Sequence, residues 1–91
     1  MDKFEAMRVF VEVADASSFS GASRKLGLSA PAVTRAIGRL ESTMGVRLFE
    51  RTTRHVRLTD SGARFFDDAR RILEEVEQAE AMAAGSYAEP K

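Results

Sequence analysis

Apolar residues recur at helical spacing along most of this 91-residue chain. Over residues 2–16 they lie on one face of a predicted helix, which carries Phe4, Met7, Phe10, Val11 and Ala14. Val9 and Val13 add a second apolar edge to that helix. Either a wide buried stripe or a surface for a partner would account for this extra edge.

A short helix, a turn and a longer helix are predicted next. Ser20 is the expected N-cap of a helix over residues 21–26, and Gly27 ends it. Ser29 caps a second helix over residues 30–44, where Pro31 is tolerated because first-turn N–H groups lack intrahelical partners. Its expected buried stripe is Val33, Ile37, Leu40 and Met44. This order of elements is a helix-turn-helix.

The spacing of apolar residues changes from helical to alternating after Gly45. Val46 and Leu48, and later Val56 and Leu58, alternate with polar residues, as expected for two short strands. The polar, basic stretch "ERTTRH" between them predicts a hairpin tip. A helix-turn-helix followed by a small hairpin is a winged arrangement.

A long helix is predicted to follow Thr59, which is its expected N-cap. About 25 residues of helix extend roughly 37 Å, more than so small a domain covers. Its apolar residues follow a heptad-like spacing, so we expect this seam to pair two copies in a homodimer; the seam consists of Phe65, Ala69, Ile72, Leu73, Val76 and Ala79. A fraying helix, or one packed on another domain, is the alternative.

These elements predict a mainly α fold. Residues 1–58 form a winged helix-turn-helix of three helices and a short two-stranded wing, residues 59–84 a long dimerising linker helix, and residues 85–91 a polar tail.

The net charge of zero conceals a strongly uneven distribution. Residues 24–57 hold eight basic side chains against Glu41 and Glu50, a balance of +6, whereas the flanking segments carry −2 and −4. A basic centre of this kind is typical of a phosphate-binding face, although a solvated basic surface has the same composition.

Other classes of protein are disfavoured by what the sequence contains. It has no cysteine, and its longest apolar runs are a few residues, so we expect a cytoplasmic protein with no membrane segment and no disulfide. His55 is the single histidine, and no carboxylate stands beside it to orient it for catalysis. No glycine-rich phosphate loop or metal-ligand cluster occurs. We therefore expect neither an enzyme nor a cofactor.

Three stretches give the chain a specific family resemblance: "SFSGASRKLGLSAPAVTRAIGRLE", "GVRLFERTTR" and "LTDSG". Together they resemble the DNA-binding domain of the LysR-type transcriptional regulators, from the first helix through residue 62. The resemblance implies a dimer that binds double-stranded DNA at an inverted-repeat-like, A·T-rich site. It also implies that a small-molecule effector acts only through a C-terminal domain, which this sequence lacks.

The candidate DNA-binding residues lie at the start of the 30–44 helix and on the wing. From the pattern alone, that helix presents Ala30, Pro31, Thr34, Arg35 and Gly38 to a major groove, with its N-terminus near a phosphate. Arg54 suits an adjacent A·T-rich minor groove. The family's contact positions correspond to Ser29, Ala30, Pro31, Thr34, Arg35, Thr52 and Arg54, with Arg51 nearby.

Two positions depart from the family pattern. Ala30 stands where glutamine is usual, so an amide that could read a base edge is missing. Gly38 stands where a longer polar residue is common, and glycine costs a helix up to about 1 kcal/mol relative to alanine. The sequence thus predicts a sequence-specific dimeric DNA-binding regulator. A dimerising protein-interaction module with a basic face for an acidic partner is the alternative.

Overall fold

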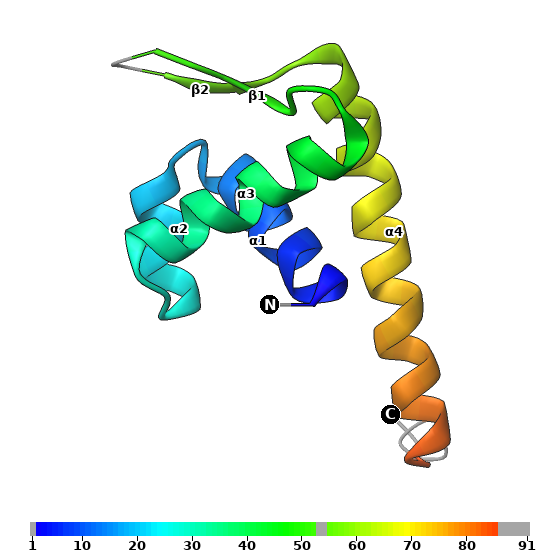
Figure 1. Cartoon of the computed structure of the whole chain (residues 1–91). Helices are drawn as coiled ribbons and strands as arrows, with labels where there is room; N and C mark the ends of the chain where they lie inside the picture. Colours follow the sequence, from blue (N-terminus) through cyan, green and yellow to red (C-terminus); the bar gives the residue numbers. More distant parts are fainter. Residues whose placement is uncertain (1, 53–54, 86–91) are drawn as a thin grey trace.

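Four helices and one antiparallel pair of strands make up residues 2–52 and 55–85, which the computed structural model describes. In chain order they are α1 (Lys3–Ala16), α2 (Phe19–Leu26), α3 (Ala30–Met44), β1 (Phe49–Arg51), β2 (Val56–Leu58) and α4 (Asp60–Ala83). Figure 1 shows α1, α2 and α3 grouped together, the strands extending as a wing, and α4 running past the group along one side. The predicted mainly α winged helix-turn-helix is confirmed.

Side-chain caps determine where three of the helices begin. The Asp2 carboxylate accepts a hydrogen bond from the Glu5 N–H at 2.8 Å, and α1 starts there. The Ser29 hydroxyl accepts one from the Ala32 N–H at 3.2 Å, and the Thr59 hydroxyl one from the Gly62 N–H at 2.9 Å. Both predicted caps, Ser29 for α3 and Thr59 for α4, are confirmed.

The predicted start of α2 is wrong by two residues. Ser18, and not Ser20, is the N-cap, and its hydroxyl accepts a hydrogen bond from the Gly21 N–H at 2.9 Å. The earlier start places Phe19 inside the helix, where its ring packs edge-on against Phe49 with centroids 5.7 Å apart. That aromatic contact links α2 to the wing. The sequence does not decide which serine is the cap, because each serine of the run could cap a helix and the contact with Phe49 is not a local pattern.

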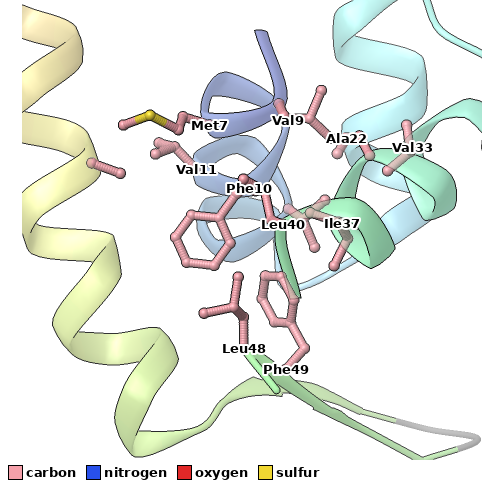
Figure 2. Close-up of a cluster of buried hydrophobic side chains, with 14 of the residues drawn as sticks. Met7, Val9, Phe10, Val11, Ala22, Val33, Ile37, Leu40, Leu48 and Phe49 are labelled. Carbon is pink, nitrogen blue, oxygen red and sulfur yellow. The ribbon is translucent and has the colours of Figure 1, made fainter. Parts of the chain in front are cut away.

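Phe10 of α1 occupies the centre of the core (Figure 2). Its ring is fully buried and lies 5.3 Å from Phe49 and 5.1 Å from Phe65, measured between ring centroids. Val9 and Val13 are buried as well, so the second apolar edge of α1 belongs to a wide buried stripe.

Two apolar residues expected in the core are instead largely exposed. Phe4 is 47% exposed in the first turn of α1, and Met44 is 38% exposed in the last turn of α3. Both lie at the end of a helix, where the remaining helices no longer cover the apolar face. The rest of the predicted α3 stripe is buried, namely Val33, Ile37 and Leu40.

The wing is shorter than the alternation of residues predicted. β1 pairs with β2 in antiparallel register, with Phe49 opposite Leu58 and Arg51 opposite Val56. The second strand begins where predicted, but the first begins at Phe49 and not near Val46, which is 40% exposed. Leu48 and Phe49 are consecutive and both buried, so the alternation breaks at the start of the strand.

Among the described residues, α4 contacts the domain through its first three quarters, as far as Glu77. Two ion pairs join it to α1: Arg70 to Asp15 at 3.3 Å and Arg8 to Glu77 at 3.1 Å. Among the described residues beyond Glu77, no ion pair or side-chain hydrogen bond reaches another element. Over the same described ranges, none of the helices has the length and apolar character needed to cross a membrane.

Candidate nucleic-acid interface

The exposed face of α3 carries the predicted base-reading residues. Ser29, Ala30, Pro31, Thr34 and Arg35 are all exposed. Thr34 and Arg35 follow Ala30 and Pro31 by four residues each, so they continue the same side of the helix. The opposite side of α3 faces the core through Val33, Ile37 and Leu40. The structure therefore brings the five residues together on one solvent-facing surface.

The N-terminus of α3 has little hydrogen-bonding capacity left for a phosphate. Pro31 has no N–H, the Ala32 N–H is bonded to the Ser29 hydroxyl, and the Val33 N–H is bonded to the Ser29 carbonyl. Of the four positions from Ser29 to Ala32, only Ser29 and Ala30 keep an N–H group without a hydrogen-bond partner among the described residues. We therefore expect the N-terminus of α3 to contribute less to phosphate binding than the sequence suggested, and the exposed side chains of α3 to contribute more.

The ion pairs of the described residues divide the basic side chains into two groups. Arg8, Lys25, Arg47, Arg70 and Arg71 each lie within 4 Å of a carboxylate. By contrast, seven basic side chains have no acidic partner among those residues, and five of the seven belong to the basic segment 24–57; the seven are Lys3, Arg24, Arg35, Arg39, Arg51, Arg57 and Arg64. Positive charge that is not neutralised within the chain is therefore concentrated around α3 and the wing, where it can attract phosphate groups.

Arg51 does not pair with Glu50 or with the linker helix. Its guanidinium lies over the ring of Phe19, 4.4 Å from the centroid, as a cation–π contact. The residue stays exposed, so its charge still contributes to the basic surface, while the contact joins β1 to α2.

The residues that close the wing are only partly described. The Thr52 N–H donates to the His55 carbonyl at 2.9 Å, and the His55 N–H donates to the Thr52 hydroxyl at 3.0 Å. Thr52 is exposed at this turn, as the family resemblance implied. Arg54, the residue predicted to enter a minor groove, lies outside the described residues.

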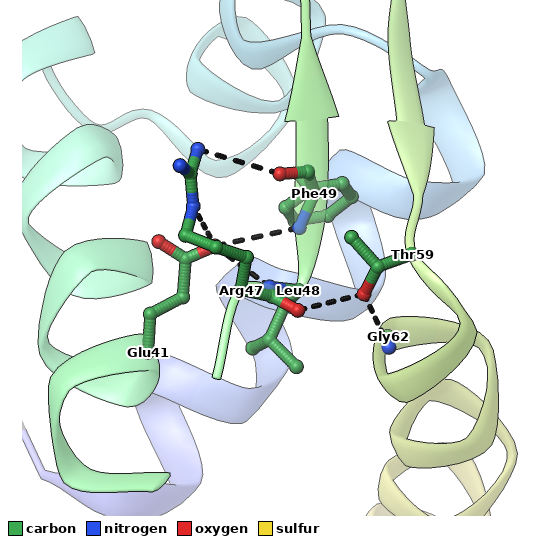
Figure 3. Close-up of polar contacts among 6 residues, drawn as sticks. All are labelled: Glu41, Arg47, Leu48, Phe49, Thr59 and Gly62. Carbon is green, nitrogen blue, oxygen red and sulfur yellow. Dashed lines mark hydrogen bonds and ion pairs between the residues drawn. The ribbon is translucent and has the colours of Figure 1, made fainter. Parts of the chain in front are cut away.

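Glu41 connects α3 to the base of the wing (Figure 3). One carboxylate oxygen accepts hydrogen bonds from the backbone N–H of Leu48 at 2.8 Å and of Phe49 at 3.3 Å. The Arg47 guanidinium lies 3.6 Å from the same oxygen, and the Glu41 side chain is only 11% exposed. The sequence offered Glu41 only as one of two acids in a basic segment, and a carboxylate eight residues before the first strand is not a local pattern that signals this role.

Thr59 ties the other end of the wing to the start of α4, also drawn in Figure 3. Its hydroxyl donates to the Arg47 carbonyl at 2.7 Å, and its N–H donates to the Leu48 carbonyl at 3.0 Å. A Cβ atom at Gly62 would overlap the Leu48 carbonyl oxygen, so only glycine allows this approach. Both ends of the wing are therefore fixed relative to the domain, the first to α3 and the second to α4.

The seam of α4 is divided between the domain core and the solvent. Ala69 and Leu73 are buried within the chain itself, at 0% and 6% exposure. Phe65, Ile72 and Val76 are partly exposed, and Ala79 is exposed. Two of the six predicted pairing residues are thus already covered by this chain, and the most exposed of the six, Ala79, lies in the C-terminal half of α4.

No cluster of histidine, cysteine, aspartate or glutamate in the described ranges has the arrangement of a metal site. The arrangement of α2, α3 and the wing, with its unpaired arginines, defines the chain as a winged helix-turn-helix domain.

Comparison with known proteins gives the family. Residues 4–63 match the family described as bacterial regulatory helix-turn-helix protein, lysR family. A transcriptional repressor of Pseudomonas aeruginosa is 42% identical over 90 residues, which are 99% of this chain and 28% of the repressor. The regulator CrgA of Neisseria meningitidis is 46% identical over 76 residues, 84% of this chain and 25% of CrgA. The chain belongs to the lysR family, whose members are transcriptional regulators and not enzymes.

Solved structures agree with this assignment. The CbnR DNA-binding domain in complex with DNA superposes with a TM-score of 0.88 at 35% identity, covering 94% of this chain and 99% of that one. The BenM DNA-binding domain with catB site 1 DNA gives a TM-score of 0.89 at 31% identity, covering 98% and 100%. The chain spans about a quarter of the length of the curated relatives it matches.

Proposed function

We propose that this chain binds double-stranded DNA sequence-specifically as a homodimer, with α3 in the major groove and the wing at the adjacent minor groove. The observation that carries the proposal is the exposed, acid-free face of α3, where Thr34 and Arg35 stand beside Arg39. An α-helix fits the major groove, and arginine is the side chain that most often contacts guanine there.

The two relatives crystallised as DNA-binding domains with DNA support the same function. In our proposal, Arg35 contacts a base edge or a phosphate, Thr34 and Ser29 contact the backbone, and Ala30 and Pro31 touch bases through apolar contact. Thr52 and Arg54 of the wing contact the minor groove at an A·T-rich site, with Arg51 adding charge near the phosphates.

The dimer in this proposal forms through the C-terminal half of α4. Val76 and Ala79 lie on one side of that half, and no other described element covers Ala79. A partner helix would cover this side and set the spacing of the two half-sites on the DNA.

Replacing Arg35 by alanine tests the major-groove assignment. We expect Arg35→Ala to weaken binding to a duplex selected from a random DNA pool by about 1–3 kcal/mol, roughly 5- to 150-fold, and to relax the sequence preference at one position of each half-site. Fluorescence anisotropy on a labelled duplex measures the affinity. Arg71→Ala is the matched control: Arg71 is also exposed but lies on α4, paired with Asp68 at 3.1 Å.

A salt titration of the complex between the parent chain and the selected duplex separates DNA binding from the protein-interaction alternative. Binding through several phosphates makes log affinity fall linearly with log salt concentration, with a slope close to the number of phosphates neutralised. If Arg35→Ala and Arg71→Ala bound the duplex equally well, α3 would not be the reading element. If the parent bound an acidic polypeptide but no duplex, the protein-interaction alternative would replace the proposal.

A further inference from the structure

Gly38 lies in the middle of the exposed face of α3, and no contact among the described residues requires a glycine there. It follows Thr34 by four residues and precedes Ser42 by four, so the three positions form one row on the helix surface. After proline, glycine is the least favourable residue for a helix interior. Its presence here therefore needs an explanation.

Other glycines of the described residues have such an explanation within the molecule. Gly27 and Gly45 adopt positive φ angles of 70° and 73° at the ends of helices. At Gly62 a Cβ would overlap the Leu48 carbonyl oxygen, and at Gly21 it would lie 3.3 Å from Ser18. At Gly38 the backbone is helical and nothing lies within 4 Å of an added Cβ. The space is open, so any constraint on this position comes from outside the chain.

The surroundings of Gly38 indicate what approaches it. An open hollow of about 420 Å³ lies along this row and is lined by Arg35, Gly38, Arg39, Ser42 and Thr43. Arg35 and Arg39 stand at its border and have no acidic partner within residues 2–52 and 55–85, so they favour a polyanion there. The floor at Gly38 itself is apolar, because backbone N–H and C=O groups inside an α-helix are already bonded to each other.

We infer that Gly38 is a specificity-determining residue whose bare Cα surface receives the methyl group of a thymine in the major groove; this inference rests on the proposed function. The thymine 5-methyl is the apolar group that a base pair presents in that groove. A side chain at position 38 would occupy the same space and hold the helix farther from the base edges. Ala30 and Pro31, on the same face, extend the apolar strip toward the N-terminus of α3.

The substitution Gly38→Ala tests this inference, because stability and binding should change in opposite directions. Alanine raises helix propensity, so we expect a higher Tm for Gly38→Ala than for the parent chain. We also expect affinity for the selected duplex to fall about tenfold, in the range of one lost base contact. A variant that is more stable and binds more weakly cannot have lost affinity by unfolding.

The DNA supplies the matched control. Each thymine of a half-site is replaced in turn by deoxyuridine, which differs only in lacking the methyl group. For the parent chain, we expect affinity to fall about fourfold at one thymine, the value of one buried methyl group. For Gly38→Ala, the same replacement should cost nothing further, so the two changes are not additive.

Two results would overturn the inference and leave the proposed function intact. In the first, Gly38→Ala binds the thymine duplex as tightly as the parent chain does. In the second, Gly38→Ala loses the same factor of affinity, relative to the parent, on the thymine duplex and on the deoxyuridine duplex. A parent chain that selects no duplex from the pool would overturn the proposed function, and this inference with it.

Discussion

Gly62 shows how strongly a single residue constrains this fold. It lies in the first turn of α4, and its missing side chain lets the helix pass directly against the Leu48 carbonyl. The Thr59 hydroxyl, which caps α4, is hydrogen bonded to the Gly62 N–H on one side and to the Arg47 carbonyl on the other. Sequence patterns identified the Thr59 cap, since it stands before an apolar-periodic run. They could not identify the tight contact, because it depends on a backbone atom fourteen residues away in the chain.

We expect Gly62→Ala to destabilise the chain by about 3 kcal/mol, because backbone must shift to admit the added carbon. Urea unfolding followed by circular dichroism measures this change. Gly38→Ala makes the same chemical change and serves as the comparison, because we expect it to raise the free energy of unfolding. A loss below about 0.5 kcal/mol for Gly62→Ala, the usual size of a surface substitution, would show that the contact relaxes at little cost.

At the scale of elements, the sequence predicts helices better than the wing. The periodic runs with clear caps give α3 at its observed residues and α4 to within a residue at each end. The first strand is misplaced because the backbone groups of Arg47 and Leu48 bond elsewhere: the Leu48 N–H donates to the Glu41 carboxylate, and the Arg47 and Leu48 carbonyls accept from Thr59. Likewise, α2 starts early because Phe19 packs on Phe49. Both errors come from contacts between elements, which a local pattern does not contain.

Glu41 should govern how firmly the wing is held. We expect Glu41→Gln to lower stability by about 1–2 kcal/mol, since charge-assisted hydrogen bonds to two N–H groups are exchanged for weaker ones. Amide hydrogen exchange at Leu48 and Phe49 should accelerate more than exchange in the core of α1. Glu50→Gln is the control, since Glu50 is exposed on β1 and forms no ion pair among the described residues. Equal acceleration in both variants would contradict the anchoring role.

At the scale of the whole molecule, α4 gives the chain its elongated shape of 48 × 25 × 23 Å. The sequence predicted this helix and its apolar seam from spacing alone. Spacing could not predict that Ala69 and Leu73 would be used by the core of the same chain, because it does not show how far the domain reaches along the helix. The exposed face of α3 was predictable from its apolar spacing, its charge and its Ser29 cap.

The exposed part of the seam should control association of two copies. We expect Ala79→Asp to convert a dimer into a monomer in sedimentation velocity, because an unpaired carboxylate would be buried between apolar surfaces. Ala79 is exposed in the single chain, so the fold of each copy should survive, which circular dichroism would verify. Gln78→Asp adds the same group one position away, on a different side of the helix, and should remain dimeric. A dimeric Ala79→Asp protein would place the pairing surface elsewhere.

The hydrogen bonds of Thr59 with Arg47 and Leu48 hold one end of α4, and the ion pair of Glu77 with Arg8 holds it 18 residues later. Between these points Ala69 and Leu73 are buried in the core. The 24 residues of the helix extend about 36 Å, of which only the last six, about 9 Å, follow Glu77. A displacement of the end of α4 therefore moves the helix and the domain together as one rigid body, with no hinge between the wing and Glu77.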